Sequence, residues 1–122
     1  MFELKTKKHP SQDKLKEKLD YDSQKGMLYR KSSYDPINDF CISYLGGINS
    51  VSGYRSANFK ANNYRHSRLV WIYHNGDIPE GMVVDHINHI RHDDRIENLQ
   101  LLSYSDNCKK QKYAHYKERI EL

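Results

Sequence analysis

The spacing of apolar residues in the first third of the chain predicts a helix and a hairpin. Leu15 and Leu19 stand four residues apart within residues 11–20, and Ser11 is a suitable N-cap, so a short helix is expected there. Residues 21–31 combine the turn-forming run DSQKG with the apolar run MLY, which is typical of a β-hairpin. A polar loop is expected to follow over residues 31–39.

The middle of the chain predicts a β-meander followed by a helix. Three strands are expected, near residues 42–48, 54–60 and 64–68, with turns at 49–53 and 61–63. The run SRLVWIYHN over residues 67–75 predicts a short helix that buries Leu69, Val70, Trp71 and Ile72, and Gly76 stands where a helix commonly ends.

The last third changes to a strand, loop, strand and helix. Strands are predicted at residues 83–87 and 99–102, on either side of a polar loop at 88–98. Ser103 and Asp106 then resemble a capping box that opens a helix over residues 104–116. The expected fold class is therefore α+β: a small antiparallel sheet with short helices (residues 1–75), then a hairpin and helix (residues 76–122), together forming one compact unit.

Length and composition fit one small domain outside membranes. The chain has 122 residues, of which 37% are apolar and 30% charged. It contains no run of about 18 apolar residues, so no membrane-spanning helix and no membrane partner are expected. The amino terminus has no apolar signal core, which favours a cytoplasmic protein.

Charge is distributed unevenly along the chain. The net charge is +4, residues 54–71 hold four basic and no acidic side chains, and residues 107–122 hold five basic and two acidic ones. Between them, residues 76–98 hold six acidic and two basic side chains. An acidic centre between basic flanks suits a protein that attracts a phosphate backbone and holds a hard cation, although ordinary solvated faces would give the same pattern.

The polar residues of the last third form a candidate site. Asp85 and His86 end the first predicted strand, and Asn107 lies in the first turn of the helix that packs across the hairpin. Successive strand residues point to opposite faces, so a bend or strand end is required if Asp85 and His86 serve one point. The side chain of Asn98, at the end of the loop, is placed to hydrogen-bond loop backbone and hold the His86 segment rigid.

The run VDHINHIRHDDRIENLQLLSYSDN resembles the signature of the HNH endonucleases, in particular their compact phage and intron-encoded type. The resemblance implies that Asp85 and Asn107 bind a metal ion, that His86 is the general base, and that Asn98 braces the loop and orients that base. It extends upstream through LDYDSQKGMLYR, GGINSVSGYRSANF and SRLVWIYHNG, so it covers most of the chain from Leu15 to Asn107.

Three departures from the family pattern stand near the site. Asp94 occupies a position that is often Asn, which is expected to add negative charge near the metal. His89 replaces a frequent Gly, and Ser67 stands where a His commonly precedes the Arg-Leu-Val-Trp run, with His66 one residue earlier.

The resemblance implies a DNA endonuclease that hydrolyses phosphodiester bonds with Mg²⁺ (or Mn²⁺). Carboxylate and amide oxygens are hard ligands, and histidine, with an ordinary pKa of about 6.5, suits the role of base. The expected partner is double-stranded DNA, the expected state is a monomer or a homodimer, and the expected setting is a phage-infected bacterial host. A DNA-binding or regulatory protein without turnover is the main alternative, and an RNA-directed protein is a third.

Basic side chains on both sides of the site are the candidate DNA contacts. They are Arg55, Lys60, Arg65, Arg68, Arg95, Lys109, Lys110 and Lys112. Arg95 is equally placed to pair with Asp94 or Glu97, and the three lysines have the alternative of forming a solvated helix face.

Overall fold

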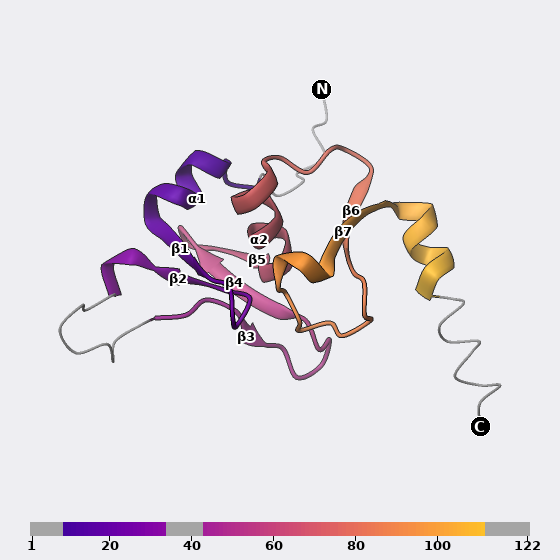
Figure 1. The fold of residues 1–122 in the computed structure, drawn as a ribbon, viewed down its shortest axis with the longest axis horizontal. Coiled ribbons are helices and arrows are strands. Elements are labelled where there is room, and N and C mark those ends of the chain that lie inside the picture. Colours follow the sequence, from indigo (N-terminus) through magenta and orange to yellow (C-terminus); the bar gives the residue numbers. More distant parts are fainter. Residues whose placement is uncertain (1–8, 34–42, 112–122) are drawn as a thin grey trace.

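The computed structural model describes residues 9–33 and 43–111 (Figure 1). Its elements, in chain order, are α1 (Gln12–Lys18), β1 (Leu19–Asp22), β2 (Met27–Arg30), the 3-10 helix η1 (Lys31–Ser33), β3 (Gly47–Ile48), β4 (Arg55–Phe59), β5 (Asn62–Arg65), α2 (His66–Asn75), β6 (Met82–His86), the 3-10 helix η2 (Ile96–Asn98) and β7 (Leu99–Ser103). A helix over residues 104–111 follows β7 directly.

All strands pair in antiparallel fashion, in three small sheets. The sheets are β1–β2, β3–β4–β5 and β6–β7. Together with the short helices they confirm the predicted α+β class. Figure 1 shows α2 near the centre of the molecule, the β6–β7 hairpin beside it, and the helix over residues 104–111 beyond that hairpin.

Local signals set several element ends as the sequence predicts. The Ser11 hydroxyl accepts a hydrogen bond from the Lys14 N–H at 3.4 Å and caps α1. Gly76, with φ of 85°, ends α2 by donating its N–H to the Ile72 carbonyl at 2.9 Å. The Ser103 hydroxyl accepts from the Asp106 N–H at 3.1 Å and caps the last helix. The expected end of that helix at residue 116 lies outside the described residues.

The meander is present, but three of its limits differ from the prediction. The third strand, expected over residues 64–68, is β5 at residues 62–65, because α2 already begins at His66. In the described part of 42–48 only Gly47 and Ile48 form strand, and Tyr44 makes a single bridge to Tyr29 of β2. The β4–β5 turn uses Lys60 and Ala61, with φ of 50° and 64°, rather than residues 61–63. Such a two-residue turn matches strand twist, although neither residue is the usual Asn or Gly.

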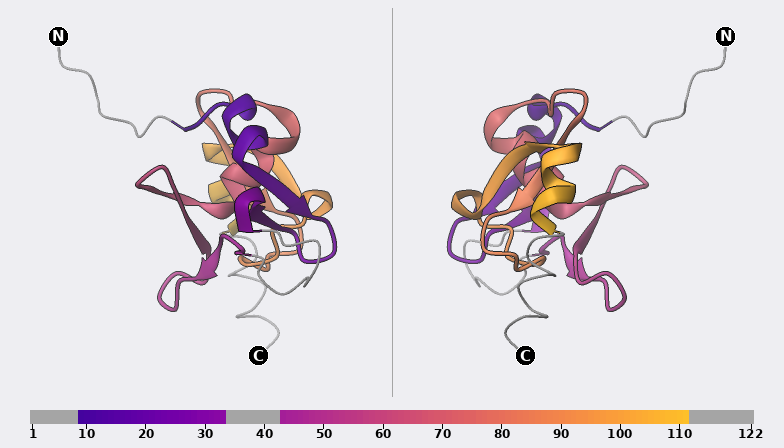
Figure 2. Two further views of the ribbon diagram at one scale, coloured as in Figure 1. Left: turned by 90° about the vertical axis from the view of Figure 1, so that its left-hand side faces the viewer. Right: turned by 90° about the vertical axis from the view of Figure 1, so that its right-hand side faces the viewer.

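One apolar core joins both parts of the chain. Leu15 of α1, Leu28 of β2 and Leu69 of α2 are fully buried, and Leu99 of β7 belongs to the same cluster. Trp71, expected to be buried, is half-buried against it. The two views of Figure 2 show α1 and α2 packed together at one end, with the β4–β5 hairpin projecting from the other elements. No helix in residues 9–33 and 43–111 is long and apolar enough to span a membrane.

Candidate active site

Asp85 lies in β6 with its carboxylate turned toward the last helix. It stands opposite Gln100 of β7, whose side-chain amide donates to Asp85 Oδ2 at 2.8 Å. The Lys110 ammonium donates to the same oxygen and, at 2.9 Å, to the His86 carbonyl. Asp85 is only 8% exposed, so this nearly buried carboxylate is balanced by a positive charge from the helix.

Asn107 is carried to the same place by helix geometry. It is half-buried and precedes Lys110 by three residues, which puts both side chains on one face of the helix. Because Lys110 reaches Asp85, the face that bears Asn107 is turned toward β6. The structure therefore brings together the strand and the helix that carry the two predicted metal ligands.

The types of donor on these two elements suit a divalent cation. The Asp85 carboxylate already holds one cationic group, the Lys110 ammonium, at a nearly buried position. The donors on the two elements are a carboxylate and an amide oxygen, the hard ligands that Mg²⁺ and Mn²⁺ prefer.

His86 ends β6 and turns to the opposite side of the hairpin. It stands opposite the buried Leu99, is 6% exposed, and its Nε2 lies 2.6 Å from Asp94 Oδ1. β6 ends at His86, one residue before the predicted end of the strand, and the imidazole and the Asp85 carboxylate have different hydrogen-bond partners. Only the His86 carbonyl shares a partner, Lys110, with Asp85.

Asp94 links His86 to a second histidine. Its other oxygen, Oδ2, lies 2.7 Å from Nδ1 of His66, the fully buried first residue of α2. Burial raises the pKa of the Asp94 carboxyl, but the hydrogen bonds with His66 and His86 outweigh burial and hold that pKa below its ordinary value. The negative charge that Asp94 adds near the site therefore lies against the two histidines, His66 and His86.

Asn98 ties the two ends of the loop together. Its Oδ1 accepts from the Asn88 N–H at 3.1 Å, and its Nδ2 donates to Asn88 Oδ1 at 2.9 Å and to the Asp93 carbonyl at 2.8 Å. Asn98 itself is 6% exposed. These bonds hold the loop that carries Asp94 next to the end of β6.

His89 adopts the backbone conformation that glycine favours at this position. Its φ is 65°, in the left-handed region. The loop therefore turns here although the frequent Gly is absent.

One aromatic ring lies beside His86, and two guanidinium groups lie near that ring. The Tyr54 ring centroid is 5.9 Å from that of His86, and the Arg65 and Arg91 guanidinium carbons lie 3.9 and 5.2 Å from the Tyr54 centroid. Arg65 is one of the predicted DNA contacts. The sequence does not single out Arg91, because it lies in the acid-rich segment over residues 76–98. Tyr54 was one of many tyrosines in the sequence, and only packing singles it out.

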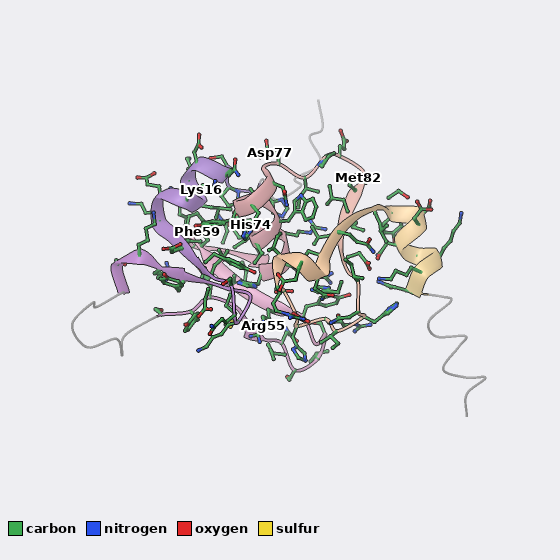
Figure 3. The ribbon with its side chains drawn as sticks, in the orientation of Figure 1. Lys16, Arg55, Phe59, His74, Asp77 and Met82 are labelled. Atoms are coloured by element: carbon green, nitrogen blue, oxygen red, sulfur yellow. The ribbon has the colours of Figure 1, made fainter. Side chains whose placement is uncertain are left out.

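The other predicted DNA contacts fall into two groups. Lys60 and Lys109 are exposed, and Arg68 is half-buried with a pKa lowered by burial and by the charge of Arg65. Arg55, labelled in Figure 3, instead donates to the Gly46 and His92 carbonyls at 2.7 and 2.9 Å.

Arg95 and the helix lysines complete the set. The Arg95 guanidinium is held by both carboxylate oxygens of Asp93 at 2.8 Å, with Glu97 at 3.7 Å, so its carboxylate partner in the loop is Asp93 and not Asp94. The Lys110 ammonium faces Asp85. Lys112 lies outside the described residues.

The hairpin and the helix docked on it carry Asp85, His86 and Asn107, with the His86 imidazole and the Asp85 carboxylate bound to different partners. Residues 64–109 match the family model described as HNH endonuclease, so the resemblance seen in the sequence is confirmed. This segment carries the Asp-His pair, Asn98 and Asn107, and it indicates a nuclease hydrolase.

A structural comparison agrees on the fold. The chain is similar to a solved structure described as "DNA binding and cleavage by the HNH homing endonuclease I-HmuI", with a TM-score of 0.59 and 20% sequence identity. The likeness covers 80% of this chain and 53% of that one, so this chain spans about half the length of its structural relative. No protein of curated function matches the chain.

Proposed function

We propose that the protein is a metal-dependent endonuclease that hydrolyses phosphodiester bonds in double-stranded DNA. The observation that carries the proposal is the docking of the last helix on β6. This contact, made by Lys110, joins the Asp85 carboxylate to the helix face bearing Asn107. Asp85 and Asn107 both lie within the segment that matches the HNH endonuclease model.

Asp85 and Asn107 are the proposed ligands of Mg²⁺ (or Mn²⁺). The metal, when bound, polarises the scissile phosphate and stabilises negative charge on the departing oxygen. A metal ion bound to Asp85 would displace the Lys110 ammonium from this carboxylate. Lys110 would then be available to bind a DNA phosphate, which is the role that the sequence predicts for it.

His86 is the proposed general base. Its imidazole accepts the proton of the attacking water, and Asn98 holds the neighbouring loop in place through bonds to Asn88 and to the Asp93 carbonyl. A base held this way loses little orientational freedom when the substrate arrives.

DNA is the proposed substrate because cationic and aromatic groups adjoin the base. The Arg65 and Arg91 guanidinium groups lie near the Tyr54 ring, and that ring lies beside His86, where a phosphate backbone would pass. The net charge of +4 favours a polyanion generally. We assign residues 1–75 as the part that positions DNA and residues 76–122 as the part that cuts it. The structural relative, whose description names DNA binding and cleavage, supports the substrate class.

The proposal extends to a homing-type enzyme of a phage or another mobile element, acting in the cytoplasm of the infected host. The fold likeness to a homing endonuclease supports this. Sequencing the ends of a digested random DNA library would reveal a preferred site if the enzyme is of this type, and evenly distributed cuts would argue against it.

Cleavage of supercoiled plasmid tests the proposed reaction. The protein with Mg²⁺ is expected to convert supercoiled DNA to cut forms, and EDTA is expected to abolish this. His86→Ala is expected to lower the rate by about 10²–10⁴-fold, the usual contribution of a general base. Asp85→Asn is expected to lower the rate as well, because it removes a carboxylate ligand of the metal. Asp77→Asn, at an exposed position labelled in Figure 3, is the matched control and should cut normally.

Two outcomes would contradict the proposed reaction. Undiminished cleavage by His86→Ala would remove His86 from the role of base. Binding of DNA by the wild-type protein without cutting would favour the alternative, a DNA-binding or regulatory protein on the same fold.

A further inference from the structure

The hydrogen bonds around His66 fix where its proton lies. The Leu28 backbone N–H donates to His66 Nε2 at 3.1 Å, within the core. A backbone N–H can only donate, so Nε2 must carry its lone pair, and the single ring proton of neutral His66 lies on Nδ1. Since His66 is fully buried, solvent offers no competing partner.

The hydrogen bonds of Asp94 fix the position of the proton on His86 in the same way. His66 Nδ1–H donates to Asp94 Oδ2 at 2.7 Å, and the carboxylate, which is 1% exposed, accepts on both oxygens. The contact of 2.6 Å between Asp94 Oδ1 and His86 Nε2 then requires the proton of His86 to lie on Nε2. His86 Nδ1 is left with the lone pair.

We infer that Asp94, held in place by His66, is a positioning residue that fixes the tautomer of His86 and leaves Nδ1 as the proton acceptor. The catalytic consequence rests on the proposed function, whereas the tautomer itself does not. In the reaction, the water O–H bond breaks and its proton binds His86 Nδ1. The water oxygen forms a bond to phosphorus, the bond from phosphorus to the leaving oxygen breaks, and that oxygen takes a proton from solvent. Asp94 stabilises the imidazolium that forms.

A purely structural role for the three residues would predict only a loss of stability on mutation. A positioning role for Asp94 makes a further prediction about which ring nitrogen of His86 carries the proton. In Asp94→Asn the amide oxygen is the only group able to accept from His66 Nδ1–H, because Leu28 still holds the His66 tautomer. The amide NH₂ must then face His86 Nε2 and donate to it, so the proton of His86 moves to Nδ1 and the acceptor is lost.

The experiment combines ¹⁵N NMR of the imidazole nitrogens with cleavage kinetics. In the metal-free wild-type protein, at a pH where imidazoles are neutral, the expected protonated nitrogens are Nδ1 of His66 and Nε2 of His86. Asp94→Asn is expected to leave the His66 signals unchanged, to exchange the two His86 signals, and to lower kcat by at least about 10²-fold.

His66→Asn is the matched control. Its Nδ2 can replace Nδ1 as the donor to Asp94, while the Leu28 N–H loses its acceptor. This variant is expected to have a lower Tm, yet to keep the Nε2–H tautomer of His86. It thereby separates loss of stability from loss of positioning.

The outcomes are distinguishable. A wild-type His86 protonated on Nδ1, or an Asp94→Asn variant with unchanged His86 signals and unchanged kcat, would overturn the inference. If Asp94→Asn does not fold, the wild-type spectrum still decides. If the wild-type protein shows the expected tautomers but cuts no DNA, the positioning of His86 by Asp94 is supported and the proposed function is contradicted.

Discussion

At the scale of single residues, the most informative side chain is Asp94. A carboxylate that is 1% exposed accepts hydrogen bonds from two histidines, one at the start of α2 and one at the end of β6. It thereby connects the helix, the loop and the strand around the site. The buried negative charge of Asp94 is stabilised because both carboxylate oxygens accept hydrogen bonds.

Asp94 gives the stability of the protein a specific dependence on pH. Its pKa is lowered in the folded state, so its contribution is present above the unfolded value of about 3.9 and is lost as the pH falls through the lower folded value. At pH 7, Asp94→Asn is expected to destabilise the fold by about 1–3 kcal/mol. Thermal unfolding of both proteins from pH 7 to pH 2 should show the difference shrinking below about pH 4.

Asp77→Asn, at an exposed position, is the control for this titration and should follow the wild-type curve throughout. A gap between wild type and Asp94→Asn that stays constant down to pH 2 would show that the ionised carboxylate is not what stabilises the fold.

At the scale of elements, the turn between β1 and β2 packs against the loop between β6 and β7. Gly26 has φ of 66°, and a Cβ there would lie 2.5 Å from the backbone nitrogen of Arg95 and 2.7 Å from the Cα of Arg95. The Tyr21 hydroxyl, on β1, accepts from the Ile96 N–H at 2.9 Å. The N-terminal hairpin thus supports the loop that carries Asp94 and Asn98.

Replacing Gly26 should therefore damage more than the turn. Gly26→Ala is expected to cost about 3 kcal/mol or more, because left-handed strain of about 1–2 kcal/mol adds to a clash with backbone atoms. Gly81→Ala is the matched control, with a similar φ of 81° and nothing near the added Cβ, and should show the strain alone. Urea unfolding measures both, and equal losses would mean that the hairpin does not press on the loop.

The contact between the last helix and β6 predicts competition between two cations. Lys110 and a divalent metal would bind the same Asp85 carboxylate, so Lys110→Met is expected to bind Mn²⁺ several-fold more tightly. Titration calorimetry measures this, with the exposed Lys109→Met as control. Unchanged affinity in a folded Lys110→Met variant would show that the metal does not use this oxygen.

At the scale of the whole molecule, each chain offers one candidate site. A single site cuts one strand per encounter, so a monomer is expected to produce nicked circles before linear DNA. A gel time course with excess plasmid, together with sedimentation of the protein, tests this. Linear DNA formed without a nicked intermediate by a sedimenting dimer would support the homodimer instead.

Much of this protein follows from local sequence signals. The Ser11 and Ser103 caps, the glycine after α2 and the alternating runs of the last hairpin act over a few residues, and the structure confirms them. The order of Asp85, His86, Asn98 and Asn107 likewise predicts the resemblance to HNH endonucleases, and residues 64–109 match that family model, because a motif is a property of the sequence itself. The turn at Lys60 and Ala61 was misplaced because neither residue carries the usual turn signal.

Only the tertiary structure decided which polar groups form hydrogen bonds and ion pairs with one another. His66 and Asp94 lie 28 positions apart in the chain, and the Leu28 amide lies 38 positions from His66. Their meeting depends on α2, β2 and the loop packing on one core, which no local pattern encodes. Hydrogen bonds act only over about 3 Å, so the sequence could supply the histidines and the carboxylate, but only the folded chain could bring them together.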